Sequence, residues 1–382
     1  MMKKIIVLFI AATLLLCLFT ACNKDDNPDH PEKEIKYGKV IYVATNGNDE
    51  NDGSEKSPVA TIYGAVKKLG EYKSANGLPD GGIKIEFAEG TYSVIETINL
   101  TEELSGEEEK PIVFAPADGA NVVFDGGIVL NNEDFKPVTD EDVLAILKTD
   151  DARSNVLCLD LSKPEYSILF NEGYNSFLQT LSSDGDIQTI ARWPNYDEYQ
   201  RAEIIENDGD YSVIAITEEQ VANWSASPTL AWLGYGQFDW SESRITHDIL
   251  FDAERNAICI PNNLVSYQPV ENNMPFFVYD LLCELDEPGE YYRDNENKLL
   301  YYWPSKDLGK TKLSISANPS FGFDIKNAKY ITIKGITFEN YCTTPIYGNT
   351  NNFSLIDCTI SCCGDYAIEI NGNNNTFDGN TT

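Results

Sequence analysis

The chain has 382 residues, 42% of them hydrophobic, and its formal net charge is −33 because 61 acidic residues outnumber 28 basic ones. Such a chain has enough apolar material for a sizeable core, in one elongated domain or two compact ones. The strong negative charge excludes nucleic acid as an expected partner, because phosphate binding needs a basic face.

The first 21 residues have the pattern of a secretion signal: two lysines precede an apolar run that is too short to span a bilayer comfortably. Leu18 to Cys22 resembles a bacterial lipoprotein cleavage site, in which Cys22 becomes the lipidated first residue. The acidic residues that follow resemble the surface-export signal of Bacteroidota lipoproteins. We therefore expect residues 22–38 to be a flexible tether, and the protein to be exported and held at the outer membrane, facing the cell surface, by a lipid anchor only.

Short strands separated by turns are expected next. An apolar face with helical spacing over residues 58–69 predicts a helix that caps the exposed edge of the first strands. The strand patterns in this region fall at residues 40–43, 81–87, 90–100, 111–115 and 122–124.

This region and two later motifs resemble a known group of proteins. YVATNGNDENDG, GGIKIEFAEGTYSV and PIVFAPADGANVVFDGG resemble the N-terminal part of right-handed parallel β-helix proteins that act on polysaccharides. ARWPN at residues 191–195 and LDEPGEYY at 285–292, with LYYWP at 300–304, resemble motifs of β-helix glycoside hydrolases of the fucosidase/xylanase type. The resemblance spans residues 40–382 and implies an all-β fold, a right-handed parallel β-helix, and a glycan as partner. Given the net charge, we expect a neutral polysaccharide or oligosaccharide.

The domain organisation follows from where a repeat is visible. Residues 39–148 are expected to hold the cap and the first rungs of the β-helix, and residues 149–314, which lack the repeat, a β-rich insertion. Residues 315–382 are expected to return to the β-helix. The insertion holds all five tryptophans, and we predict that Trp232, Trp240 and Tyr235 bind sugar rings; the alternative is that a small β-domain buries them.

A 22-residue repeat ends the chain. Asn327, Asn349 and Asn371 are evenly spaced, and apolar positions alternate between them as in β-strands. Each unit cannot bury its apolar face alone, so the units must stack as rungs. We expect the asparagine column to form an internal ladder and the cysteines in the repeat to fill the core. The last unit lacks a strand, which suggests a fragment whose catalytic rungs lie beyond residue 382.

The chemistry expected of this chain is that of carboxylates. Only His30 and His247 occur, so a Ser-His-Asp or Cys-His device is nearly excluded. No Lys or Arg follows Gly335, which disfavours the basic residue of a β-helix lyase. Glu369 is the best catalytic candidate, because its flanking isoleucines predict that it points outward from a strand, and Asp365 is next. The alternative for each acidic residue in this stretch is a solvated surface or turn position. The five acidic residues in this stretch are Glu339, Asp357, Asp365, Glu369 and Asp378.

The distance between rungs tests whether these carboxylates can form a catalytic pair. Neighbouring rungs lie about 4.8 Å apart, so carboxylates one rung apart would match a retaining glycosidase and two rungs apart an inverting one. Subtracting 22 places no carboxylate under Asp365, Glu369, Asp357 or Asp378. A catalytic pair would then lie across one rung or use positions beyond residue 382.

The sequence therefore predicts a glycoside hydrolase with paired carboxylates. A glycan-binding surface lipoprotein without catalysis and a calcium-dependent β-helix lyase are the alternatives. No cofactor is required. Calcium is the one ion that the acidic turn at residues 46–53 suggests, although its ligand spacing is not that of an EF-hand. No metal site is predicted from cysteine or histidine spacing.

Overall fold

The computed structural model describes residues 36–170, 179–227, 229–318 and 320–382. The secretion signal, Cys22 and most of the tether lie outside these residues, so their assignments stay predictions. Among the helices in the described ranges, none is both long and apolar enough to cross a membrane.

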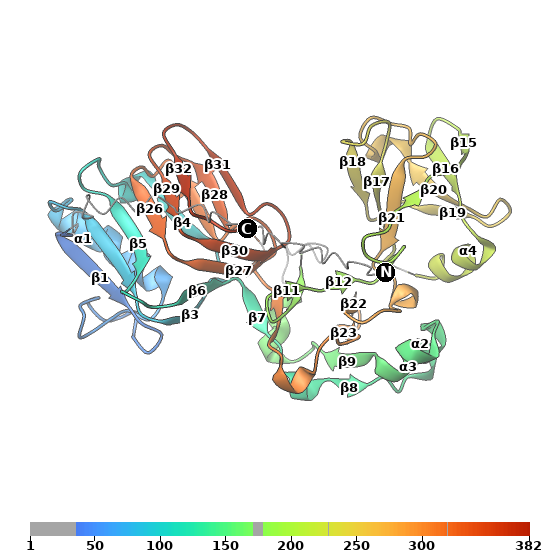
Figure 1. Cartoon of the computed structure of the whole chain (residues 1–382), viewed down its shortest axis with the longest axis horizontal. Coiled ribbons are helices and arrows are strands. Elements are labelled where there is room, and N and C mark those ends of the chain that lie inside the picture. Colours follow the sequence, from blue (N-terminus) through green and yellow to red (C-terminus); the bar gives the residue numbers. More distant parts are fainter. Residues whose placement is uncertain (1–35, 171–178, 228, 319) are drawn as a thin grey trace, which may run out of the picture. The chain divides into compact units, whose positions relative to one another are not determined.

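Three parallel sheets form the β-helix, as predicted (Figure 1). Each complete turn of the chain contributes one strand to each sheet, whereas the first and last strands of the first sheet have no counterpart in the other two. Equivalent strands of successive rungs pair in register. The first sheet runs β1 (Lys39–Val43), β2 (Ile83–Phe87), β5 (Ile112–Pro116), β26 (Ile331–Lys334), β29 (Ser354–Ile356) and β32 (Thr376–Asp378). The second runs β4 (Ile98–Thr101), β25 (Phe323–Lys326), β28 (Ile346–Asn349) and β31 (Ile368–Asn371). The third runs β3 (Gly90–Ser93), β6 (Val122–Asp125), β27 (Thr337–Tyr341) and β30 (Thr359–Cys363).

The core of the β-helix is a column of inward-facing side chains. Alternate residues of each strand point inward, which is why the strands show buried and partly exposed positions in alternation. Aromatic rings from successive rungs pack against one another in this column, mostly edge to face. The fully buried rings are Phe87, Phe114, Phe124, Phe323, Phe338 and Phe353.

Helix α1 (Ile62–Asn76) covers the first rung, which confirms the predicted capping helix. Thr61 caps its N-terminus by accepting a hydrogen bond from the Gly64 N–H. Ile62 and Leu69 are fully buried in the same core as Ile41 of β1. The helix therefore shields the outermost strand of the first sheet.

The acidic turn beside this helix has a structural role. One carboxylate oxygen of Asp49 accepts the N–H groups of Ala60 and Thr61, and the other accepts the Thr61 hydroxyl. Groups of three or more His, Cys, Asp or Glu residues able to hold a metal ion are absent from the described ranges. Calcium at this turn stays a prediction.

The insertion leaves the rung stack continuous. β5 before it pairs directly with β26 after it, Ile112 beside Ile331, so the chain leaves and rejoins the β-helix at the same level. The insertion begins at β7 (Gly127–Val129), earlier than the predicted residue 149, because β7 pairs with β24 (Leu313–Ser316) and not with a rung. The sequence pattern missed this because residues 127–148 carry no repeat that separates rung from insertion.

Four sheets build the insertion. The first runs β11 (Asp186–Ile187), β10 (Leu181–Ser183), β24 and β7. The second runs β12 (Thr189–Ile190), β22 (Glu290–Asp294), β23 (Leu299–Tyr302), β9 (Leu157–Asp160) and β8 (Lys136–Pro137). The third runs β13 (Arg192–Trp193), β21 (Pro275–Tyr279), β17 (Ala231–Tyr235) and β18 (Glu242–Ile245), and β14 (Gln200–Arg201) also pairs with β21. The fourth runs β15 (Ile204–Asn207), β16 (Tyr211–Ala215), β20 (Ala257–Pro261) and β19 (Leu250–Asp252). Its helices are α2 (Glu141–Ile146), α3 (Asp150–Asn155) and α4 (Glu218–Trp224).

The 22-residue step holds from β26 to β29 and from β27 to β30, but β25 and β28 pair with a step of 23, and the asparagine column is not internal. Asn349 pairs with Asn371 one rung on, yet Asn327, Asn349 and Asn371 are all exposed, so they form no internal ladder. Other asparagines make the rung-to-rung contacts: Asn375 accepts the Phe353 N–H at 3.0 Å, and Asn380 accepts the Cys358 N–H at 2.9 Å. The even spacing of the three asparagines indicated where a turn recurs, but it did not indicate whether their side chains point into the core or outward.

Five of the seven described cysteines are buried, which fits the predicted core-filling role, whereas Cys158 and Cys363 are only partly buried. Cys358 lies in the β-helix core and Cys283 in the largest core of the insertion. The seven cysteines in the described part of the chain are free: Cys158, Cys259, Cys283, Cys342, Cys358, Cys362 and Cys363.

Candidate functional site

Two carboxylates lie side by side on the outer face of the third β-helix sheet. The parallel register places Glu339 of β27 directly beside Asp125 of β6. Their neighbours Phe124 and Phe338 are fully buried in the core, so the two carboxylates point away from it. Adjacent strands are about 4.8 Å apart. A carboxylate pair one rung apart therefore exists within this chain.

Asp125 is held by three donors. One of its oxygens accepts the Gly127 N–H and the side-chain amide of Asn340, each at 2.9 Å, and the other lies 3.2 Å from the Lys312 ammonium. Asn340 in turn accepts the Ser182 hydroxyl at 2.7 Å. Asn340 has a φ of 61°, a left-handed conformation that asparagine tolerates better than most residues. Asp125 is only 4% exposed, so these contacts fix its orientation.

Glu339 faces a cavity. It is half-buried and lines a space of about 280 Å³ between the third β-helix sheet and the insertion. Burial raises the pKa of the Glu339 carboxyl; the positive charge of Lys312 opposes the rise and the negative charge of Asp125 adds to it. The other lining residues are Thr91, Val123, Ser182, Asp184, Gly185, Lys312, Ser314 and Asn340.

A second carboxylate reaches the cavity from the insertion. Asp184 and Gly185 form the two-residue turn between β10 and β11, with φ of 51° and 81°. An Asp-Gly pair is the usual choice for such a turn because both residues need positive φ. One Asp184 oxygen accepts the backbone N–H of Lys312 at 2.8 Å. Asp184 is exposed and lines the same cavity as Glu339.

The insertion hid this site from the sequence. The prediction that no carboxylate pairs with another assumed a constant 22-residue step, whereas the rung below Glu339 precedes the insertion and contributes Asp125. The prediction that no two carboxylates pair is therefore wrong for Glu339, which lies beside Asp125 in the strand register. The one usable signal in the sequence is the Asp-Gly pair at residues 184–185, because such a pair is typical of a tight hairpin turn.

The predicted catalytic residues lie elsewhere. Glu369 is on β31 in the second β-helix sheet, exposed and beside Tyr347, as the 22-residue step predicted. Tyr347 pairs with Asp324 one rung below, so Asp324 and Glu369 are two rungs, or about 10 Å, apart on one face. The Tyr347 ring stacks on Phe321 at a centroid distance of 3.8 Å. Asp365 lies exposed in the turn before β31. Neither residue joins the cavity at Glu339.

The predicted aromatic residues divide between core and surface. Trp232 is fully buried against Phe276, so its ring offers no face to a sugar in this structure. Tyr235, three residues on, lies on the opposite face of β17, because side chains alternate along a strand. Trp240 is 63% exposed and its ring is parallel to that of Phe238, with Tyr267 edge-on. The ring of Trp240 is therefore accessible and that of Trp232 is not, and sugar binding by these residues stays a prediction.

The fold is similar to that of a solved structure. A glycoside hydrolase from Bacteroides superposes with a TM-score of 0.69 over 86% of this chain and 63% of that protein, at 16% sequence identity. The chain shares its fold with a glycoside hydrolase. A structure titled "The complex structure of XylC with xylose" matches over 85% of this chain and 42% of that one, at 13% identity and a TM-score of 0.38, which does not establish a shared fold.

Sequence comparison adds little. No family model matches the chain. YwoF, an uncharacterized protein of Bacillus subtilis (strain 168), is 33% identical over 101 residues, which are 26% of this chain and 19% of YwoF. The chain thus spans less than two thirds of the glycoside hydrolase and about a fifth of YwoF.

Proposed function

We propose that this protein hydrolyses glycans and that the cavity at Glu339 takes part in the reaction. The single observation that carries the proposal is a half-buried carboxyl of raised pKa in a cavity that a second carboxylate, Asp184, also lines. Glycoside hydrolysis requires a carboxylic acid that gives a proton to the leaving oxygen and a carboxylate that acts on the sugar carbon or on a water. The fold shared with a glycoside hydrolase supports the same reading.

Each group has a distinct role in this proposal. Glu339 is the proton donor, because burial raises the pKa of its carboxyl and so favours the protonated form that an acid needs. Asp184 is the second carboxylate, since it is exposed to the cavity whereas Asp125 is not. Asp125 is a positioning residue: it holds Lys312 and Asn340, both of which line the cavity. Lys312 is then placed to donate to a sugar hydroxyl.

A non-catalytic glycan-binding protein is the second candidate. The observation that favours it is the exposed aromatic cluster of Phe238, Trp240 and Tyr267, whose members are 42%, 63% and 55% exposed. Flat aromatic faces of this kind bind the apolar faces of sugar rings. Glycan binding by this cluster does not depend on whether Glu339 is catalytic.

We also propose that the protein works at the cell surface, held by a lipid on Cys22. The support is the secretion-signal pattern and the lipoprotein-like Leu18 to Cys22 stretch. A Cys22→Ser variant is expected to leave the membrane fraction. Its retention there would contradict the anchor.

An activity screen separates the candidate functions. The purified full chain is incubated with neutral and acidic plant and host glycans, and released sugars are measured by chromatography. Hydrolysis predicts saturated sugar products, whereas binding without release would contradict it. Unsaturated products that form only with calcium would indicate a lyase instead. Each positive substrate is repeated with the Glu339→Gln variant.

A further inference from the structure

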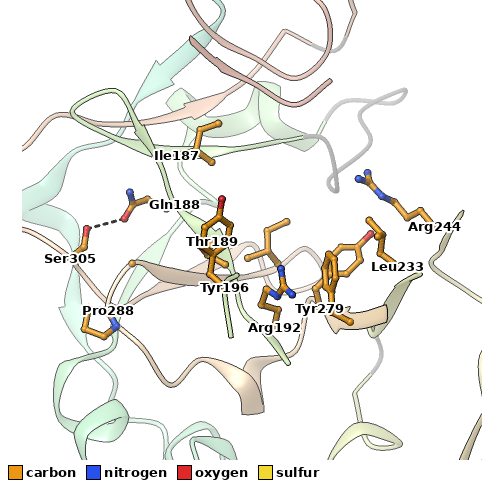
Figure 2. Close-up of a pocket in the computed structure, with 13 residues that line it drawn as sticks. Ile187, Gln188, Thr189, Arg192, Tyr196, Leu233, Arg244, Tyr279, Pro288 and Ser305 are labelled. Atoms are coloured by element: carbon orange, nitrogen blue, oxygen red, sulfur yellow. Dashed lines mark hydrogen bonds between the residues drawn. The ribbon is translucent and has the colours of Figure 1, made fainter. Parts of the chain in front are cut away.

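The insertion contains a larger cavity of about 550 Å³, separate from the one at Glu339 (Figure 2). Its size lies within the range of about 300–1,000 Å³ that is typical of small-molecule sites. Its wall comes from the segment around β12 and β13, from β17, β18 and β21, and from the turn at Pro288 and Gly289. None of the residues lining it is acidic, in a chain with 61 acidic residues.

Two arginines reach this cavity from different strands. Arg192 of β13 is 7% exposed, and its guanidinium lies 3.6 Å from the centroid of the Phe277 ring. Its Nε and Nη2 donate to the backbone oxygens of Pro194 and Glu198, which fixes the plane of the group. Arg244 is exposed on β18, beside Leu233 of β17. In Figure 2 the two guanidinium groups lie on either side of the Tyr279 ring in this view.

Neither arginine forms an ion pair with a described carboxylate. Across the described part of the chain, no carboxylate oxygen comes within ion-pair distance of Arg192 or Arg244, although lysines and Arg255 do form such pairs. Glu242, two residues from Arg244, instead accepts the Tyr235 hydroxyl at 3.4 Å.

Two buried carboxyls, Asp280 and Glu290, directly follow lining residues in the chain. Asp280 follows Tyr279, and burial raises the pKa of its carboxyl to about 7. Glu290 follows Gly289, and one of its oxygens accepts the N–H groups of Asp286 and Glu287. Burial raises the pKa of the Glu290 carboxyl to about 8, so it is mostly neutral at pH 7. The lining itself presents two positively charged side chains and no acidic one, within a strongly negative protein.

The rest of the lining suits a ring that carries hydroxyl groups. Tyr196, which is 67% exposed, and Phe277 supply aromatic surface, and Ile187 and Leu233 add apolar surface. Neutral hydrogen-bonding side chains complete the wall: Gln188, Thr189 and Ser305. The Gln188 amide is held in place because its oxygen accepts the hydroxyls of Tyr302 at 2.8 Å and Ser305 at 3.0 Å.

We propose that this cavity binds an anionic sugar unit, one that carries a carboxylate or a sulfate ester, through Arg192 and Arg244. Guanidinium groups suit such anions because their donors can engage two oxygens at once. The sugar part of this inference rests on the proposed function, and the anionic part rests on the arginines alone. It changes the expectation of a neutral glycan, because local charge and not net charge decides what a cavity binds.

Binding of three small sugars tests the proposal. Galacturonic acid, galactose 6-sulfate and galactose are titrated against the full chain by calorimetry. At least one anionic sugar is expected to bind at least about tenfold more tightly than galactose, which corresponds to about 1.4 kcal/mol. The anionic sugar that binds more tightly identifies the preferred anion as a carboxylate or a sulfate ester. Equal affinity for all three sugars, or no binding to any, would overturn the proposal.

Matched variants connect the binding to the arginines. Arg244→Gln is expected to weaken the anionic sugar about tenfold or more, whereas Arg201→Gln, the same charge change at an exposed site outside the lining, should leave binding unchanged. Arg192→Lys should also weaken binding, and its melting curve shows whether the fold is intact. Equal effects of the Arg244 and Arg201 variants would contradict the proposal. The Glu339→Gln variant should still bind, so a failure of hydrolysis and a failure of this site are distinguishable.

Discussion

Three charged side chains, Glu339, Asp125 and Lys312, determine what the smaller cavity can do. Asp125 is ion-paired with Lys312 at 3.2 Å and lies beside Glu339 in the strand register. The two neighbours act on the pKa of Glu339 in opposite directions: Asp125 raises it and Lys312 lowers it. Substitution of Asp125 or of Lys312 should therefore shift the pKa of Glu339 in opposite directions while Glu339 itself is unchanged.

This tuning gives a pH prediction of definite sign. A proton donor loses activity as pH rises through its pKa, so the alkaline limb of kcat/KM reports Glu339. Asp125→Asn removes a charge that raises this pKa and leaves Lys312 unopposed, so the alkaline limb should move to lower pH. Lys312→Met removes the charge that lowers it, so the limb should move to higher pH. The measurement is the pH profile of kcat/KM on a substrate found in the screen.

Opposite shifts also serve as the control. Both substitutions break the same ion pair, so any general damage to the site would act in one direction for both variants. Shifts of the same sign, or no shift in either, would show that Glu339 is not the group that limits activity at high pH.

Single residues also show where sequence patterns stop being informative. The aromatic-rich stretch at residues 231–240 nominated Trp232, Trp240 and Tyr235 together because they are close in sequence. Alternation along β17 places Trp232 in the core and Tyr235 on the other face, and only Trp240 has a largely free ring. Burial depends on which strand packs on which face, and that is set by pairing partners far away in the chain.

The rung is the element that the sequence predicts best. Strands β26 and β29 pair with a step of 22 residues, as the repeat indicated, because each strand must present the same inward residues to its neighbour. The step is not constant, however. Asp324 and Tyr347 pair although they are 23 positions apart, so a turn holds one more residue there. One extra turn residue is enough to hide Asp324 below Glu369 from a fixed-period alignment.

A stability prediction follows for the rungs. Ile333 of β26 is fully buried between neighbouring rungs, and Lys334 beside it is exposed. Ile333→Ala should lower the free energy of unfolding by about 2–5 kcal/mol, because it removes buried methyl groups and leaves a cavity. Lys334→Ala should change it by less than about 0.5 kcal/mol. Urea unfolding followed by circular dichroism measures both, and similar values for the two variants would contradict the stacked core.

At the scale of the whole molecule, the insertion brings together groups that the sequence keeps apart. Asp125 and Glu339 lie on either side of it along the chain, and Asp184 and Lys312 belong to it. The sequence predicted the β-helix, its cap and its insertion from local patterns and resemblance. It could not predict this cavity, because the pairing of β6 with β27 depends on where the chain re-enters the rung stack. Net charge does not describe each cavity either, since −33 overall coexists with a cavity lined by two arginines and no acidic residue.

The central claim is that Glu339, and not the more exposed Glu369, carries the chemistry. The most direct measurement compares initial rates of sugar release by Glu339→Gln and Glu369→Gln, which make the same change on neighbouring sheets of one β-helix. Loss of a general acid is expected to lower the rate about 10²–10⁴-fold in Glu339→Gln, with Glu369→Gln close to the unchanged protein. Full activity of Glu339→Gln, with melting curves showing both variants folded, would contradict the account.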